Sequence, residues 1–495
     1  MVSKELKKAR DYEAGKMKEI GREERPAFHL TGGCGWINDP NGFSFYRGEY
    51  HLFYQYHPFS NVWGPMHWGH AKSRDLLHWD RLPVAMAPDT SCDCAGCFSG
   101  SALTLPDGRH LLMYTGVHSD IGDGDDRERF QTQCLAFGDG VNYEKYEGNP
   151  VICPDMIPWE CRATDFRDPK IWQESDGTYR CVAAAMTAER NSRIVRFRST
   201  DALSWEYDGV IAESTAQLGG MWECPDYFEL DGKQVLCVSP MAMMPEGREY
   251  HAGHNTLALV GDEDLVTHEF CRESMQQIDS GIDFYAPQTM LTPDGRRVMV
   301  GWMQAWSNSK FVPPGVKYFG QLSLPRELHV RNGRLIQQPV RELMEFRTEA
   351  VVLKNVGMGS EKRAFEGIEG RLLDMTVTVR DLSELKKLEI FVAADSTYHT
   401  SVSFTPKRKL LRIDRSYSGY LYDIVHTRDM DVETENGELV IRFVMDRYSL
   451  ELFIGKGERT ATLSLFTPLS AQGIYFRAEG KTVIDIEKYT ISELS

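Results

Sequence analysis

The chain has 495 residues, 42% of them hydrophobic and 26% charged, and its formal net charge is −16. At about 100–200 residues per domain, this length suffices for two to four domains with real cores. The composition is near the globular average, which argues against a disordered, collagen-like or coiled-coil protein. The acidic balance disfavours a nucleic acid or an anionic membrane as partner. No apolar run approaches the ~20 residues of a membrane span.

The N-terminal segment, residues 1–27, predicts a charged surface helix rather than a secretory signal. It contains eight Lys or Arg and six Asp or Glu residues and has no apolar core segment. The apolar side of this helix would be formed by Leu6, Ala9, Tyr12, Met17 and Ile20. Eleven cysteines, an odd number, and the absence of an Asn-x-Ser/Thr sequence favour a reducing compartment with free thiols. We therefore expect a cytoplasmic protein.

Five segments of residues 28–340 share one pattern, in which two apolar strands flank a turn glycine. Successive turn glycines are 60, 69, 55 and 63 residues apart, and four of the five follow Asp, a strong hairpin signal. They are Gly48, Gly108, Gly177, Gly232 and Gly295. The sequence Ser-x-Asp-x-Leu-x-Trp also recurs, at 73–79 and at 199–205. The repeat predicts a five-bladed β-propeller; the alternative is a set of unrelated hairpins in one large β domain.

The remainder of the chain predicts a second domain of different composition. All ten Trp precede residue 307 and all eleven Cys precede residue 272. Strand-like alternation in Leu372–Val379 and Leu439–Val444, with intervening turns, indicates an antiparallel β-sandwich over residues 351–495. Residues 341–350 are predicted to link the two domains, with Pro339–Phe346 as a short helical segment.

The repeat also aligns acidic residues. Nine residues before the five turn glycines stand, in order, Asp39, Ser99, Asp168, Glu223 and Ala286. Equivalent positions in a propeller lie at equivalent depth around its axis, so the three acids are expected to converge on one funnel. Like charges brought together are costly because each raises the pKa of the others. A function is therefore a better explanation for them than stability.

Two carboxyl groups are the minimum for glycoside hydrolysis, and a third can hold sugar hydroxyls. The neighbouring residues suit a sugar, because they offer apolar faces or directional hydrogen bonds. These residues are Trp36, Trp63, Trp68, Phe98, Tyr285, Trp302 and Trp306, together with Asn38, Gln55, Ser99 and Arg167. We expect Arg167 to keep the adjacent Asp168 ionised. Partial desolvation by Trp222 and Cys224 would suit Glu223 to act as the general acid.

Metal binding is the rival interpretation. Acids on an axis could hold calcium, but the nearest approach to an acidic ligand loop, Asp120–Asp126, is better explained as solvated. Cys92-x-Cys94-x-x-Cys97 resembles half of a zinc site, yet no second pair follows, and buried thiols are expected instead. His67 and His70 are expected to be structural. We predict neither a metal nor another cofactor.

The ordered motifs resemble those of glycoside hydrolase family 32, the invertases and fructan hydrolases. They are WINDPNG (36–42), FYQYHP (53–58), WGHA (68–71), SRDLLHW (73–79), FSGSA (98–102), FRDPK (166–170), WECPD (222–226), DFYAPQ (283–288), PREL (325–328) and DRYSLELFIGKGERTATLSLF (446–466). The resemblance implies a five-bladed propeller with an appended β-sandwich. Ile37, where Met is commoner in the family, is a volume-conserving difference.

The resemblance also implies roles. Asp39 is similar to the family's nucleophile, Glu223 to its acid/base and Asp168 to its transition-state stabiliser. The positions that match the fructose pocket are Asn38, Gln55, Trp63, Phe98, Ser99, Arg167, Tyr285 and Trp302. The implied reaction is retaining hydrolysis of a terminal β-linked fructosyl unit through a covalent fructosyl-enzyme.

Three other functions stay open at this stage. They are a fructosyltransferase, a non-catalytic sugar-binding propeller and a related propeller glycosidase acting on arabinosides. The sequence does not distinguish sucrose, sucrose 6-phosphate, short fructo-oligosaccharides and longer fructans as substrates, and it does not give the oligomeric state.

Overall fold

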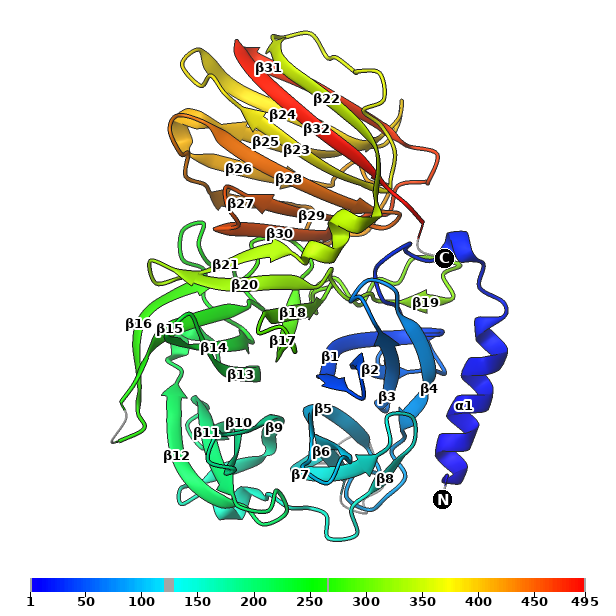
Figure 1. Ribbon diagram of the computed structural model, residues 1–495, viewed down its shortest axis with the longest axis vertical. Coiled ribbons are helices and arrows are strands. Elements are labelled where there is room, and N and C mark those ends of the chain that lie inside the picture. Colours follow the sequence, from blue (N-terminus) through cyan, green and yellow to red (C-terminus); the bar gives the residue numbers. More distant parts are fainter. Residues whose placement is uncertain (1, 120–128, 265–266, 494–495) are drawn as a thin grey trace.

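The computed structural model describes residues 2–119, 129–264 and 267–493, so the predicted acidic loop Asp120–Asp126 lies outside the described residues. Five β-sheets form a ring, and a two-sheet sandwich packs on one side of it (Figure 1). This arrangement confirms the predicted five-bladed propeller and β-sandwich. No helix among the described residues is long and apolar enough to cross a membrane.

Each blade contains four antiparallel strands, and the sheet of blade 1 has a fifth, parallel strand. Blade 1 contains β1 (Gly35–Tyr46), β2 (Glu49–His57), β3 (His67–Ser73) and β4 (Asp80–Met86). Blade 2 contains β5 (Gly96–Thr104), β6 (His110–Ser119), β7 (Arg129–Gly138) and β8 (Tyr143–Lys145). Blade 3 contains β9 (Cys161–Gln173), β10 (Tyr179–Thr187), β11 (Ser192–Ser199) and β12 (Glu206–Glu213). Blade 4 contains β13 (Trp222–Leu230), β14 (Lys233–Pro240), β15 (Leu257–Glu263) and β16 (Phe270–Gln277). Blade 5 contains β17 (Tyr285–Leu291), β18 (Arg297–Trp302), β20 (Arg326–Arg331) and β21 (Arg334–Pro339).

The first strands of the blades contact one another in a closed circle, in the order β1, β5, β9, β13, β17 and back to β1. The predicted turn glycines separate the first and second strands of the five blades, and all five have positive φ, between 77° and 90°. Each first strand is interrupted by a β-bulge opposite its second strand. The bulged segments contain Asp39, Ser99, Asp168, Cys224 and Ala286. Because a bulge re-aims a side chain, the same device recurs in all five blades. In blade 4 it contains Cys224, and the predicted position of Glu223 is one residue out, since Glu223 pairs with Ser239 as Arg167 pairs with Ala184.

The ring is closed by a short parallel strand, β19 (Tyr318–Phe319), which joins blade 1 beside β1. Gly35 pairs with Tyr318 and Trp36 with Phe319.

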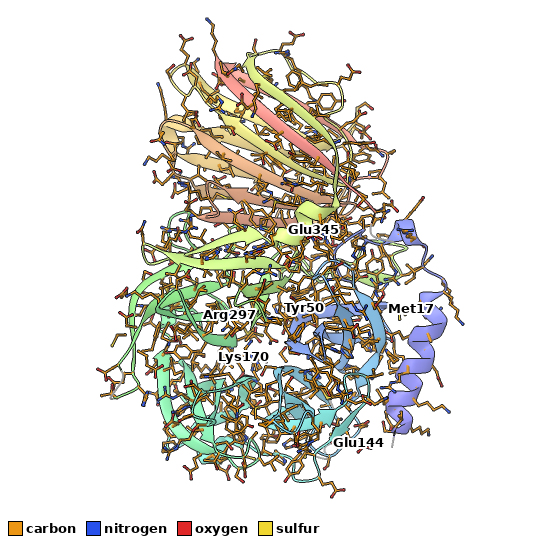
Figure 2. All side chains as sticks on the ribbon, in the orientation of Figure 1. Met17, Tyr50, Glu144, Lys170, Arg297 and Glu345 are labelled. Carbon is orange, nitrogen blue, oxygen red and sulfur yellow. The ribbon has the colours of Figure 1, made fainter. Side chains whose placement is uncertain are left out.

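Below the acids, the axis is filled by an ion pair between Lys170 Nζ and Asp226 Oδ2, at 2.9 Å. Figure 2 labels Lys170 near the middle of the ring. The propeller is therefore packed along its axis.

The second domain follows a 3₁₀ helix, η4 (Arg341–Phe346). One sheet contains β22 (Arg347–Met358), β32 (Thr482–Ile491), β23 (Leu373–Val379), β28 (Leu439–Asp446), β29 (Ser449–Ile454) and β30 (Arg459–Ser464). The other contains β27 (Thr427–Asp431), β26 (Leu410–Asp414), β25 (Thr400–Thr405), β24 (Leu385–Ala394) and β31 (Gly473–Gly480). Alternate residues of the facing strands, such as Val377, Ile390 and Phe443, form its core. Four further 3₁₀ helices are η1 (Arg22–Glu24), η2 (Pro154–Met156), η3 (Ala216–Leu218) and η5 (Pro406–Arg408).

The N-terminal helix α1 (Lys4–Met17) lies along β4 at the outer edge of blade 1 (Figure 1). Its buried residues are Leu6, Ala9 and Glu13. The predicted apolar side is therefore partly wrong, since Tyr12 is 36% exposed. Glu13 turns inward instead because its carboxyl hydrogen-bonds the Tyr56 side chain and the backbone of residue 84, and burial raises its pKa to about 7.

Buried charges join the propeller to the sandwich. The His29 ring lies 2.9 Å from Asp446 Oδ2 and 2.9 Å from Glu451 Oε1, and all three side chains are fully buried. Arg326, from β20, contacts the other oxygen of Glu451 at 2.5 Å and Asp279 Oδ2 at 3.0 Å. Each carboxylate contacts a cationic side chain, so the charges of this buried group balance one another. We call the group, which contains His29, Asp279, Arg326, Asp446 and Glu451, the polar seam.

Candidate active site

Asp39 is held by three neighbours at the entrance of the axis. Ser99 Oγ donates a hydrogen bond to its Oδ2 at 2.6 Å, and Asn38 Nδ2 donates to its Oδ1 at 3.0 Å. The Cys224 thiol lies 3.6 Å from Oδ2. Trp36 Nε1 in turn donates to the Asn38 carbonyl oxygen at 2.8 Å and fixes that amide. Burial raises the pKa of Asp39, while the hydrogen bond from Ser99 opposes this shift.

Asp168 adopts a positive φ of 64° in its bulge. Its backbone N–H donates to Thr115 Oγ1 at 2.9 Å, and its Oδ2 accepts the Cys224 N–H at 3.0 Å. Burial, followed by the negative charges of the other two acids, raises its pKa to about 7 despite the opposing charge of Arg167. The expectation that Arg167 keeps Asp168 ionised is therefore wrong. The guanidinium lies 3.8 Å from Asp168 and is directed to Glu223 instead.

Glu223 lies between a cation and a phenol. Its Oε1 accepts hydrogen bonds from Arg167 Nε at 3.2 Å and Nη2 at 3.0 Å, and its Oε2 accepts one from Tyr285 Oη at 2.7 Å. Gln131 Oε1 and Asp165 Oδ1 hold the remaining Arg167 nitrogen, at 3.2 and 3.5 Å. This carboxyl group is thus fixed in orientation from both oxygens.

Cys224 shows that the three acids meet at one place. Its N–H contacts Asp168, its thiol contacts Asp39, and its chain neighbour is Glu223. Arg167 spans Asp168 and Glu223 in the same way. The structure therefore brings the acids of blades 1, 3 and 4 together around a single point on the axis.

Aromatic side chains form the wall above this point. Trp63 packs edge-on against Phe98, with ring centroids 6.0 Å apart, and Trp36 stacks on Trp306 at 6.1 Å. Trp302 is fully buried behind these two indoles, so it supports the wall from the rear. Gln55, also buried, donates its amide N–H to the backbone carbonyl of residue 97, next to Phe98.

The residues considered for a metal or for structural roles lie elsewhere. The His67 Nδ1 donates to the Pro65 carbonyl oxygen at 3.0 Å, and the His70 ring pairs with that of His51 at 2.9 Å. Trp68 is fully buried in the core and donates to the Phe98 carbonyl. All eleven cysteines are free thiols. Among residues 2–119, 129–264 and 267–493, no three His, Cys, Asp or Glu side chains are grouped so as to hold a metal ion.

Sequence reasoning missed several residues of the site. Thr115 and Gln131 come from the second and third strands of blade 2, where the repeat carries no distinctive residue. His254, from the connection between β14 and β15, packs edge-on against Tyr285 at 5.5 Å, and burial lowers its pKa. Cys224 lies within the motif WECPD, where the sequence indicates only an apolar neighbour of Glu223. Its two contacts to acids depend on the bulge, which the sequence does not reveal.

The raised pKa of Asp168 predicts that this acid destabilises the fold. Its folded-state pKa of about 7 exceeds its ordinary value of 3.8. The wild type therefore loses stability as pH rises from about 4 to about 7, on the order of a few kcal/mol, since one pKa unit corresponds to about 1.4 kcal/mol. Asp168→Asn removes this loss, so urea unfolding should show a stability gain that is larger at pH 8 than at pH 5. An equal gain at both pH values would contradict the assignment.

Three carboxyl groups on a propeller axis, beneath an aromatic wall and among hydrogen-bond donors, define a site for cleaving a sugar linkage. Comparison with known proteins agrees with this class. The model of the glycosyl hydrolases family 32 N-terminal domain matches residues 29–339, and that of the family 32 C-terminal domain matches residues 342–493. The chain therefore belongs to glycosyl hydrolase family 32, and it is a hydrolase of the β-fructofuranosidase type.

Individual relatives are similar over nearly their whole length. The chain is 35% identical to a raffinose invertase of Escherichia coli over 93% of each chain. It is 32% identical to a sucrose-6-phosphate hydrolase of Zymomonas mobilis, covering 99% of this chain and 97% of the relative. Among solved structures, a Bombyx mori family 32 β-fructofuranosidase in complex with sucrose superposes with a TM-score of 0.84 at 33% identity, over 98% of each chain. A sucrose-6-phosphate hydrolase of Lactobacillus gasseri gives 0.83 at 26% identity, covering 97% of this chain and 96% of that one.

Proposed function

We propose that this chain releases terminal β-linked fructose from sucrose-type substrates by double displacement, with Asp39 as the nucleophile and Glu223 as the acid/base. The carrying observation is the arrangement around Cys224. On one side of Cys224, Ser99 and Asn38 donate hydrogen bonds to the two carboxyl oxygens of Asp39. On the other side, Arg167 and Tyr285 donate to the two carboxyl oxygens of Glu223. Two separately oriented carboxyl groups at one pocket suit a reaction with two separate proton and bond-forming roles.

In the first step, Asp39 attacks the anomeric carbon while Glu223 gives its proton to the leaving glycosidic oxygen. A covalent fructosyl-enzyme results. In the second step, Glu223 takes a proton from water, which attacks the same carbon and releases fructose with net retention. Asp168 would hold fructose hydroxyls without entering the covalent chemistry, because its backbone is fixed by Thr115 and its carboxyl by the Cys224 N–H.

Methanolysis tests the proposed double displacement. With methanol present during sucrose cleavage, the fructosyl-enzyme should be intercepted, and NMR should detect methyl β-fructofuranoside as the only methyl glycoside. The α-anomer would show inversion and contradict the covalent route. Product analysis at high sucrose concentration separates the two activities that share this mechanism, because a hydrolase yields mainly fructose and glucose, whereas a transferase yields oligosaccharides.

Arg129 suggests which substituent the pocket accepts. It is exposed at the start of β7, and its guanidinium lies 5.5 Å above the Trp63 ring. Among the described residues it makes no ion pair, whereas Arg167 is committed to Glu223. Sucrose 6-phosphate carries its phosphate on the leaving glucosyl unit, which must lie at the mouth of the pocket. We therefore infer that Arg129 binds such a phosphate.

Arg129→Ala should lower kcat/KM for sucrose 6-phosphate by roughly 10- to 100-fold, the equivalent of a charge-assisted hydrogen bond of about 1.5–3 kcal/mol. The value for sucrose should change little. Steady-state kinetics on the two substrates check this. Arg109→Ala is the matched control, since Arg109 lies over Phe137 at 4.6 Å, in the turn at the opposite end of the same blade. An equal loss on both substrates would remove Arg129 from phosphate recognition.

A further inference from the structure

Two cysteines outside the catalytic machinery come together in blade 2. Cys92 is partly exposed in the turn that leads into β5, and Cys134 is fully buried in the middle of β7. The two residues are 42 positions apart in sequence, so only the blade brings them together. Cys92 belongs to the cysteine cluster that the sequence singled out, and neither residue touches the catalytic acids.

Gly116 permits their close approach. A Cβ atom placed on this glycine would lie 2.6 Å from the Cys92 carbonyl oxygen and 2.9 Å from Cys134 Sγ. The backbone of one cysteine and the sulfur of the other are therefore both pressed against a residue without a side chain. Any other residue at position 116 would separate them.

Asn149 fixes the Cys92 sulfur on the same side. The Cys92 thiol lies 3.5 Å from the Asn149 carbonyl oxygen. The Asn149 amide makes two hydrogen bonds to the backbone of Leu135, at 2.7 and 2.9 Å, directly after Cys134. The sulfur of Cys92 thus points toward the strand that carries its partner.

The two thiols also influence each other's ionisation. The neighbouring Cys134 thiol lowers the pKa of the Cys92 thiol to about 6, and burial opposes the shift. Cys92 in turn raises the pKa of Cys134. At neutral pH the accessible sulfur is therefore a thiolate, and the buried one keeps its proton, which is the division of roles between an attacking and a resolving cysteine.

We propose that Cys92 and Cys134 form an oxidisable dithiol that closes to a disulfide when the folded protein meets a hydroperoxide. The Cys92 sulfur attacks one peroxide oxygen, the O–O bond breaks, and with hydrogen peroxide the departing oxygen leaves as water after taking a proton. The resulting sulfenic acid is then displaced by the Cys134 sulfur, which forms the S–S bond and releases a second water. Two thiols are oxidised, and one peroxide is reduced to two waters.

Mass spectrometry of the full-length protein tests the proposal. Treatment with a stoichiometric amount of hydrogen peroxide at pH 7 should yield a species lighter by about 2 Da per disulfide, and alkylation of the unfolded protein should then add two fewer alkyl groups than in the untreated protein. Peptide mapping without reduction should join Cys92 to Cys134, and dithiothreitol should reverse the link. Because the link closes a long loop of the unfolded chain, the oxidised protein should also have a higher Tm than the reduced one.

Variants separate this pair from the other thiols. Cys134→Ser should abolish the link and leave a Cys92 sulfenic acid that dimedone labels, while Cys92→Ser should abolish both. The second variant keeps the test valid if the buried substitution unfolds the chain. Cys94→Ser is the matched control, because Cys94 is exposed two residues away, and it should not change the link. Oxidation of Cys94 or of the exposed Cys271 before Cys92, or a disulfide joining Cys92 to another cysteine, would overturn the proposal.

Discussion

Asp39→Asn is expected to reduce kcat on sucrose by roughly 10⁴- to 10⁶-fold, the range seen when a catalytic nucleophile is removed. The carboxamide nitrogen cannot attack the anomeric carbon, so no fructosyl-enzyme forms. The fold should persist, because an amide has the size of the carboxyl group and can still accept the hydrogen bond from Ser99. Steady-state hydrolysis by the purified variant, with circular dichroism to verify the fold, measures both effects.

An acid outside the pocket provides the control for this loss. Asp107→Asn makes the same chemical change in the exposed turn between β5 and β6, where Asp107 pairs with Arg109. Its kcat should equal that of the wild type. If Asp39→Asn kept a rate near normal, Asp39 would not be the nucleophile, and one of the other two acids would have to take that role.

Arg326→Met is expected to destabilise the whole chain by about 3–5 kcal/mol, the cost of removing one partner from a buried ionic group. Met fills most of the vacated volume, but Glu451 and Asp279 lose the cation that neutralises both of them. Arg326 also packs over the Phe284 ring at 4.7 Å, on the propeller side of the seam. Thermal and urea unfolding should show the loss, with both domains unfolding earlier because the seam belongs to both.

An exposed ion pair serves as the matched comparison. Arg412→Met removes a bidentate pair with Asp429 at 2.6 and 2.8 Å on the surface of the sandwich, where the expected cost is about 1 kcal/mol or less. Equal losses for the two variants would show that the seam contributes no more than a surface contact.

The seam should also give stability a pH dependence. Hydrogen bonds from His29 to Asp446 and Glu451 outweigh burial and raise the pKa of this histidine to about 9, from an ordinary 6.5. A raised pKa means that the contribution is fully present below pH 6.5 and disappears as pH rises through 9. A plot of unfolding free energy against pH should therefore fall over that interval, and His29→Gln should flatten it. A wild-type curve with no decline there would contradict a protonated His29.

The sequence was sufficient to place the acids because the repeat preserves register. Aligning the turn glycines places Asp39, Asp168 and Glu223 at one position, and the structure confirms that position for Asp39 and Asp168, which both lie in bulges. In blade 4 the bulge contains Cys224, so Glu223 lies one residue earlier, at the paired position that Arg167 occupies in blade 3. Because the hairpin pattern recurs in five blades, its copies can be aligned with one another within this one sequence. The architecture and the convergence of the acids could thus be predicted before any coordinates.

The partners of charged side chains could not be predicted in the same way. Arg167 precedes Asp168 in the chain, yet the bulge leaves its guanidinium 3.8 Å from Asp168, and it donates instead to Glu223 from the next blade at 3.0 Å. On α1, the period of the helix favoured Tyr12, but the polar partners that turn Glu13 inward come from residues far along the chain. The partner of a charged side chain thus depends on which hydrogen-bonding groups the tertiary fold brings near it.

The contacts of His29 also constrain how the molecule is made. Its partners, Asp446 and Glu451, follow it by 417 and 422 residues in the sequence. Trp36 likewise pairs with Phe319, so Phe319 must be synthesised before the ring can close. During translation, the segment around His29 therefore lacks its native partners until nearly the entire polypeptide has emerged from the ribosome. Early blades exposed during that interval offer strand edges to neighbouring nascent chains. Slow translation or scarce chaperones should accordingly reduce the yield of active enzyme more than they alter its final properties.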